Sequence, residues 1–206
     1  TTLSYVYKNK PSYSYECLIN YAGATVSWLN NNLQIIKKPE ETNAIFKKTN
    51  SSNGVIFIPA FVGLSSPHWL PTCKGMIYGL TPSVNKNHII RSALESIAFQ
   101  IKDYVDDLEK NQKVVCNDIY IDGGIVSNTT FMQFLANTLK RKIYVTNFKD
   151  MSSYGSLVMG LLGMKIKKNL KDISIYKQKY STYLPNKNKF PDSYNEWKEV
   201  LKNFYL

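Results

Sequence analysis

The clearest hydrophobic pattern in the chain is a helical stripe near its centre. Apolar residues recur every three or four positions from Ile89 to Leu108, and charged side chains occupy the positions between them. This spacing predicts a helix of about six turns with one buried face. Weaker stripes predict helices over residues 22–36 (ended by Pro39), 128–139, 152–164 and 192–204, and a short helix with a loop within 40–53.

Short runs of β-branched and aromatic residues predict strands between these stripes. Their order, strands first and then alternating helices and strands, predicts an α/β domain with a mixed sheet and helices on both faces. Residues 63–74 have the composition of a loop, and residues 165–191 are expected to be loosely structured. The expected strands are Thr2–Lys8, Tyr13–Leu18, Gly54–Phe61, Met76–Leu80, Asp118–Asp122 and Lys142–Thr146.

Composition indicates a globular protein. Hydrophobic residues make up 44% of the 206 positions, and no apolar run reaches the roughly 18 residues of a membrane span. The formal charge of +11 comes from scattered lysines with only two arginines, and no aromatic-basic motif of a nucleic-acid module accompanies it, so nucleic-acid binding is not favoured. The chain starts at Thr1 without an initiator Met, which suggests a piece of a longer protein or a processed one.

Cysteines and histidines give little support for a disulfide or a metal site. Cys17, Cys73 and Cys116 are odd in number, lie far apart and form no CxxC pair, which favours reduced thiols in the cytoplasm. His68 and His88 belong to different elements, so a two-histidine metal site is unsupported.

A glycine turn offers the best candidate chemistry. Residues 118–122 form a predicted strand that passes through Gly123 and Gly124 into a helix capped by Ser127 or Asn128. Free backbone N–H groups at such a turn could hold phosphate. The alternative, a plain strand-to-helix corner, fits the pattern equally well. Gly23, at another helix start, is a signal of the same kind.

Structural roles are the simpler interpretation for several other polar and aromatic residues. Glu95 is expected to make a structural hydrogen bond, and His68 is not expected to act directly. The remaining expectations are loop packing for Phe61 and Trp69, and a solvated helix face for Asp103, Asp106 and Asp107.

Four segments in the same order resemble the FGGY carbohydrate kinases. Lys74–Glu95 is similar to the C-terminal signature of that family, and Pro59–Trp69 looks like its PAFxGLxxPyW loop in the version of glycerol kinases. Residues 122–133 match DGGxxxNxxxMQ, and Ser152–Leu161 loosely resembles TALGAAYLAG. The resemblance covers about residues 1–175, and residues 176–206 are expected to form a tail with a helix.

The resemblance implies a ribonuclease-H-like, actin-like ATPase fold and the C-terminal domain of a glycerol kinase. That domain supplies most of the ATP pocket, with Gly123, Gly124 and Asn128 at the turn and Gly23 beside the nucleotide. Ser27 stands where the family commonly has Gln. Serine donates only one hydrogen bond and reaches less far, so this contact is expected to be missing or mediated by water.

The catalytic base and the glycerol contacts of the family belong to the N-terminal domain, and no residue here matches them. The resemblance therefore implies an inactive fragment that would need its own N-terminal domain for glycerol, with Mg²⁺ held mainly by the phosphates and that domain, in a protein expected to be a homodimer. Two alternatives stay open: the same domain of another FGGY sugar kinase, such as one for xylulose or gluconate, and a non-enzymatic actin-like binding module.

Overall fold

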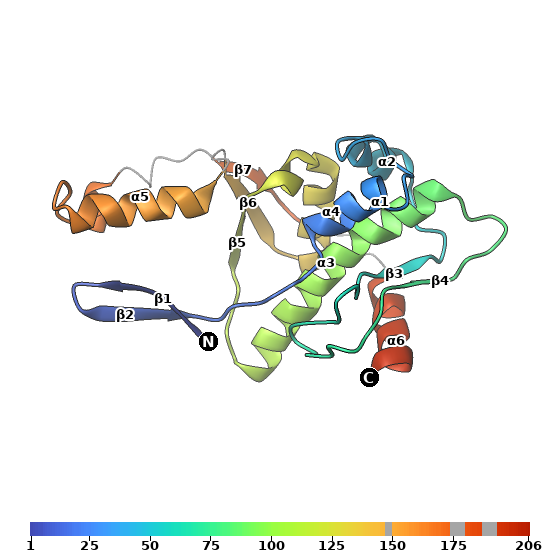
Figure 1. Cartoon of the computed structure of the whole chain (residues 1–206), viewed down its shortest axis with the longest axis horizontal. Helices are drawn as coiled ribbons and strands as arrows, with labels where there is room; N and C mark the ends of the chain where they lie inside the picture. Colours follow the sequence, from blue (N-terminus) through green and yellow to red (C-terminus); the bar gives the residue numbers. More distant parts are fainter. Residues whose placement is uncertain (147–149, 174–179, 187–192) are drawn as a thin grey trace.

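The amphipathic helix of the chain, α3 (Lys86–Asn111), runs through the centre of the computed structural model (Figure 1). Its apolar face is buried as the stripe predicts. The helix starts three residues earlier than the stripe because Asn85 caps it: the Asn85 side chain accepts a hydrogen bond from the Asn87 amide, and the Asn85 amide donates to Nδ1 of His88. These bonds satisfy backbone donors that the first turn would otherwise leave unpaired.

The structure describes residues 1–146, 150–173, 180–186 and 193–206. Most predicted elements are confirmed, with ends that differ by a few residues. The expected strand Tyr13–Leu18 is wrong in its bounds, since the second strand spans Lys10–Ser14 and residues 15–18 lie in no strand. In chain order the elements are β1 (Thr2–Tyr7), β2 (Lys10–Ser14), α1 (Gly23–Asn31), α2 (Glu41–Lys48), β3 (Ile56–Ile58), β4 (Met76–Tyr78), α3, β5 (Asp118–Ile121), η1 (Gly124–Ser127), α4 (Thr129–Leu139), β6 (Lys142–Thr146), α5 (Met151–Gly163), η2 (Leu170–Asp172), β7 (Tyr180–Tyr183) and α6 (Ser193–Tyr205).

The strands of the described residues form two antiparallel pairs and one mixed sheet. β1 pairs with β2, and β3 pairs with β4. In the third sheet β6 lies between β5, to which it is parallel, and β7, to which it is antiparallel. The α/β class and the mixed sheet are therefore confirmed. The expectation of loose structure over residues 165–191 is wrong at β7, which forms a regular strand. It forms because the backbone N–H and C=O groups on the outer edge of β6 need hydrogen-bond partners, and β7 supplies them.

Helices cover one face of the mixed sheet. Ile143 and Val145 of β6 are buried in the cluster that α3 and α4 also fill. The opposite face, for which a helical cover was also expected, carries Tyr120, which is 62% exposed and stacks on Tyr144 with ring centroids 4.9 Å apart. The period-2 alternation of strand residues accounts for this division between the faces.

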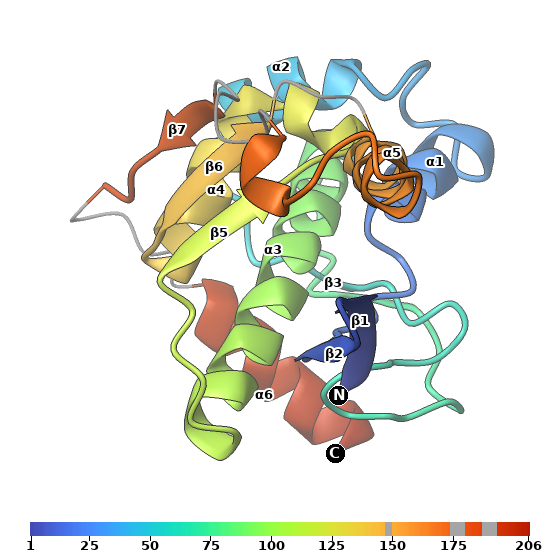
Figure 2. The same cartoon turned by 90° about the vertical axis from the view of Figure 1, so that its left-hand side faces the viewer.

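The terminal helix α6 packs on the opposite side of α3 from the mixed sheet, near the bottom of Figure 2. Trp197 is 1% exposed, and its indole N–H donates to the carbonyl of Phe57 in β3 at 3.2 Å. The residues around it form a second hydrophobic cluster that includes Ile58, Phe99 and Leu201. Residues 193–206 are thus part of the folded body, while a boundary at residue 175 stays a prediction.

Two expectations about α3 and the loop before it are wrong. Asp103 is not on a solvated face: it is 4% exposed, and its carboxylate contacts Nε2 of His68 at 2.7 Å and Nζ of Lys198 at 2.8 Å. Trp69 does not pack into its loop, since 65% of it is exposed. Phe61 does pack, against Tyr21 and Trp28. Helical periodicity cannot show that a distant helix will cover a polar stripe.

Candidate nucleotide site

The glycine turn lies at the carboxyl edge of the parallel strands β5 and β6. Gly123 has φ +91°, a backbone conformation that favours glycine, and the chain then enters the short helix η1 at Gly124. Both glycines are exposed, and a Cβ added to either would meet no atom within 4 Å. The turn therefore leaves open space beside its backbone, where a ligand could approach closely. Crevices at the carboxyl ends of parallel strands are the usual ligand sites of open α/β sheets.

Asn128 caps α4, one of the two capping residues that the sequence offered. Its Oδ1 accepts from the Phe131 amide at 2.9 Å, and its Nδ2 donates to Oγ1 of Thr42 at 3.3 Å. The residue is only 5% exposed. An Asn side chain carries two donor hydrogens and two acceptor sites, so these two bonds leave one donor hydrogen and one acceptor site for a ligand. The structural role of Asn128 is thus established by geometry, and any ligand contact would come in addition.

The first turn of α5 meets the end of β5. The carboxylate of Asp122 accepts a hydrogen bond from the Met151 amide at 3.2 Å. Asp150 caps α5 by accepting from the amide and the hydroxyl of Ser153, at 2.9 and 2.6 Å, and these bonds hold the pKa of Asp150 below its usual value. The contact between Asp122 and α5 carried no signal in the sequence, because it joins residues 29 positions apart.

Gly23 and Ser27 lie on α1. Gly23 is its first residue, and both side-chain positions are exposed. A Cβ at Gly23 would also meet nothing within 4 Å. Ala22, the residue before α1, and Val26 of α1 pack on the same hydrophobic cluster as Ile125 and Val126 of η1, so one core supports both glycine segments. Within the described part of the chain no hydrogen bond joins the two segments directly.

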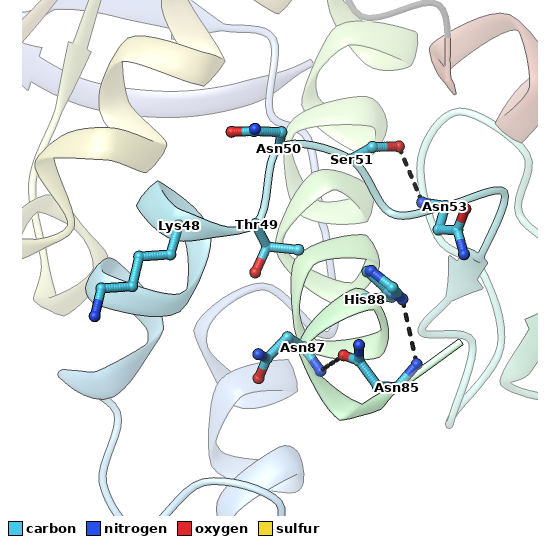
Figure 3. Close-up of a pocket in the computed structure, with 8 residues that line it drawn as sticks. All are labelled: Lys48, Thr49, Asn50, Ser51, Asn53, Asn85, Asn87 and His88. Atoms are coloured by element: carbon cyan, nitrogen blue, oxygen red, sulfur yellow. Dashed lines mark hydrogen bonds between the residues drawn. The ribbon is translucent and has the colours of Figure 1, made fainter. Parts of the chain in front are cut away.

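A polar cavity of about 450 Å³ lies elsewhere, where the loop after α2 meets the start of α3 (Figure 3). None of the five predicted nucleotide residues lines it. The polar groups at the helix start already have partners, because the Asn85 amide donates to the His88 ring and the Asn87 amide donates to the Asn85 side chain. We therefore place the candidate site at the glycine turn and not in this cavity, which is lined by Lys48, Thr49, Asn50, Ser51, Asn53, Asn85, Asn87 and His88.

Other polar groups near the core have structural partners. Glu95 is 3% exposed and bonds Nε of Arg91 at 2.7 Å, which confirms the structural hydrogen bond expected of it. Burial raises the pKa of Glu95, against the opposing effect of Arg91. Among the described residues, no three carboxylate, imidazole or thiol groups gather where they could hold a metal ion. No described helix combines the length and low polarity needed to cross a membrane.

Comparison with known proteins points to one family. The model of the FGGY family of carbohydrate kinases, C-terminal domain, matches residues 2–164. A glycerol kinase of Psychromonas ingrahamii is 31% identical over 204 residues, and one of Vibrio atlanticus is 30% identical over the same length. Each alignment covers 98% of this chain but 40% of the relative, so the chain spans about two fifths of these proteins.

Solved structures agree with this assignment. The glycerol kinase of Plasmodium falciparum with ADP has a TM-score of 0.78 and 33% identity over 90% of this chain and 37% of its own. A xylulose kinase from Rhodospirillum rubrum has a TM-score of 0.72 at 18% identity, over 89% of this chain and 38% of its own, which shows the shared fold alone. The ribonuclease-H-like, actin-like fold is thereby confirmed, and the chain belongs to the FGGY family of carbohydrate kinases, of which it is a C-terminal domain.

Proposed function

We propose that this chain is the ATP-binding C-terminal domain of a glycerol kinase, which transfers the γ-phosphoryl group of ATP to glycerol and forms glycerol 3-phosphate. The observation that carries the proposal is the open Gly123–Gly124 turn at the carboxyl edge of β5 and β6, in a chain 33% identical to a glycerol kinase solved with ADP. The xylulose kinases of similar fold share at most 19% of their aligned residues with this chain, which favours glycerol over another sugar as the substrate.

The turn would act by close approach of its backbone to the nucleotide. Gly123 and Gly124 would present amides without side chains, and the spare donor of Asn128 would add one hydrogen bond. Gly23 and Ser27 would line the site from α1. Bound Mg²⁺ would neutralise phosphate charge, as in other phosphoryl transfers. We assign no metal ligand to this chain.

The rest of the reaction needs groups that we do not find here. Phosphoryl transfer to an alcohol requires a base that accepts its proton. No residue of this chain matches the base or the glycerol contacts of the family. We therefore propose that the N-terminal domain of the same protein supplies them, that the chain alone binds nucleotide without turnover, and that the whole protein is a homodimer. Free thiols at Cys17, Cys73 and Cys116 agree with a cytoplasmic location.

Gly124→Ala tests the nucleotide site without disturbing the fold. Gly124 has no positive φ, and an added methyl group meets no protein atom within 4 Å. The free energy of unfolding should stay within about 0.5 kcal/mol of wild type, while the Kd for Mg-ADP rises about tenfold or more because the methyl group occupies the space beside the phosphates. Isothermal titration with Mg-ADP and urea unfolding measure the two quantities.

Gly160→Ala is the matched control. Gly160 is an exposed residue of α5, and its added Cβ also meets nothing within 4 Å. The helix places it about 14 Å from the first turn of α5 beside Asp122. Its Kd should equal that of wild type. Asn128→Ser adds a second test, since serine keeps the cap of α4 and loses the amide donor. Unchanged Mg-ADP affinity in Gly124→Ala would refute the site.

A further inference from the structure

A second cavity, of about 580 Å³, lies where the tip of the β1–β2 hairpin approaches the far end of α5 (Figure 1). Its volume is within the range of small-molecule sites. It shares no residue with the glycine turn. Apolar side chains of both elements line it, namely Val6 from β1 and Met159 and Leu162 from α5.

The rest of the lining is strongly basic. Lys8 comes from the hairpin, and three lysines come from the segment after α5. No carboxylate lines the cavity. Among the residues that the structure describes, none of these four ammonium groups forms an ion pair, and Lys8 donates only to the neutral Oδ1 of Asn169, at 3.0 Å. Four positive charges around one cavity repel one another unless an anion is present. The three lysines after α5 are Lys165, Lys167 and Lys168.

A simpler explanation would be that these lysines only complement the negative end of the α5 dipole. Three of the last four carbonyls of the helix, however, have backbone partners. Those of Gly160, Leu161 and Leu162 accept from the amides of the following residues, at 2.9, 3.2 and 3.0 Å. The ammonium groups are not needed as hydrogen-bond donors to the helix, so they are available to a ligand.

Tertiary hydrogen bonds hold the two sides of the cavity together. The hydroxyl of Tyr7 donates to the carbonyl of Lys168 at 3.3 Å, and Lys8 reaches Asn169, so each bond joins positions 161 residues apart. The cavity is therefore a product of the fold and not of one loop. Its lining combines apolar side chains with four lysines and contains no carboxylate.

We propose that this cavity binds an anionic amphiphile, a phosphate monoester or carboxylate on a short alkyl or aryl body. The apolar body contacts Val6, Met159 and Leu162, and the lysines pair with the anionic oxygens. Ammonium groups bind phosphate and carboxylate as point charges without fixed geometry, so the site selects charge and an apolar body together. A soluble ester and the headgroup of an anionic lipid offer the same chemistry.

Octyl phosphate is the probe for this site. Isothermal titration below its micellar concentration, with the 206-residue chain, should show saturable binding, and inorganic phosphate should bind at least about tenfold more weakly because it lacks the apolar body. In Lys165→Gln/Lys168→Gln the Kd for octyl phosphate should rise about tenfold. Flotation with phosphatidylcholine vesicles, with and without phosphatidic acid, distinguishes a lipid headgroup from a soluble ester as the ligand. If the wild-type chain binds the acidic vesicles and the double variant does not, the ligand is a lipid. If the wild-type chain does not bind them, the ligand is a soluble ester.

Lys37→Gln/Lys38→Gln is the control. It removes the same charge at two exposed positions outside the cavity, and its affinity for octyl phosphate should equal that of wild type. Equal weakening in both double variants would show a general charge effect and overturn the proposal. So would an absence of saturable binding to wild type, or octyl phosphate binding no tighter than inorganic phosphate. Circular dichroism of each variant checks that the fold is kept.

Discussion

Replacement of Asp103 by alanine tests how the terminal helix is attached to the rest of the domain. The Asp103 carboxylate on α3 joins two other parts of the chain, because it binds His68 of the 63–74 loop and Lys198 of α6. Its removal should therefore loosen the loop and the helix together. It also leaves the His68 ring, whose side chain is 18% exposed, without its partner.

The expected loss of stability follows from these two contacts. The bond to His68 is 2.7 Å long and mostly buried, and hydrogen bonds to a charged group contribute about 1.5–3 kcal/mol. The pair with Lys198 counts for less, because 46% of that lysine side chain is exposed to solvent, and exposed pairs contribute about 0.2–1 kcal/mol. Asp103→Ala should therefore lower the free energy of unfolding by about 2–4 kcal/mol at neutral pH.

Urea unfolding followed by circular dichroism measures this difference, and its pH dependence adds a second check. Burial alone would raise the pKa of Asp103, but hydrogen bonds from His68 and Lys198 outweigh burial and hold the pKa below its usual value. A carboxyl group with a lowered folded-state pKa stabilises the fold fully above its unfolded-state pKa, about 3.9, and loses this contribution as pH falls through the folded-state value. The contribution of the Asp103 carboxylate to the difference in free energy of unfolding between wild type and Asp103→Ala should therefore be constant from pH 7 to about 5. This difference should shrink below about pH 4.

Asp107→Ala is the matched control on the same helix. The Asp107 carboxylate accepts one hydrogen bond, from the side chain of Asn111 one turn later. Its removal should lower the free energy of unfolding by about 0.5 kcal/mol. If Asp103→Ala costs no more than Asp107→Ala, or if the gap does not shrink in acid, the carboxylate does not join the loop to α6 in solution and the reasoning fails.

Two further predictions concern packing and thiol reactivity. Trp197→Ala should lower the free energy of unfolding by about 3–5 kcal/mol, since it empties a buried site and removes the hydrogen-bond donor to the Phe57 carbonyl. The control Phe204→Ala, at a side chain 56% exposed, should lower it by under about 1 kcal/mol in the same urea assay. Equal losses in the two variants would place Trp197 outside the core. Burial raises the pKa of the Cys17 thiol to about 11, so about 0.1% of it is thiolate at pH 8 and iodoacetamide should modify it far more slowly than an unfolded control. Mass spectrometry after timed alkylation measures this, and equal rates in the folded and urea-unfolded chain would contradict the burial.

Local patterns predicted what depends on local chemistry. The stripe of α3, the strand β6 and the Asn128 cap follow from residues within a few positions of one another, and all three are present. The role of Asp103 could not be predicted in this way. Its partners, His68 and Lys198, lie 35 and 95 positions away, and α6 turns a polar stripe of α3 into a buried contact.

The glycine turn shows the same division. The sequence by itself determined a strand, two glycines and a capped helix in the order of the FGGY family, because strand and helix periodicities and the cap are properties of short segments. Only the tertiary structure decided that the turn is open, that Asn128 also bonds Thr42, and that Asp122 after β5 bonds the start of α5. It also decided that Lys8 and three lysines after α5 line one cavity. These features depend on which distant surfaces pack together, and packing is decided by the whole chain.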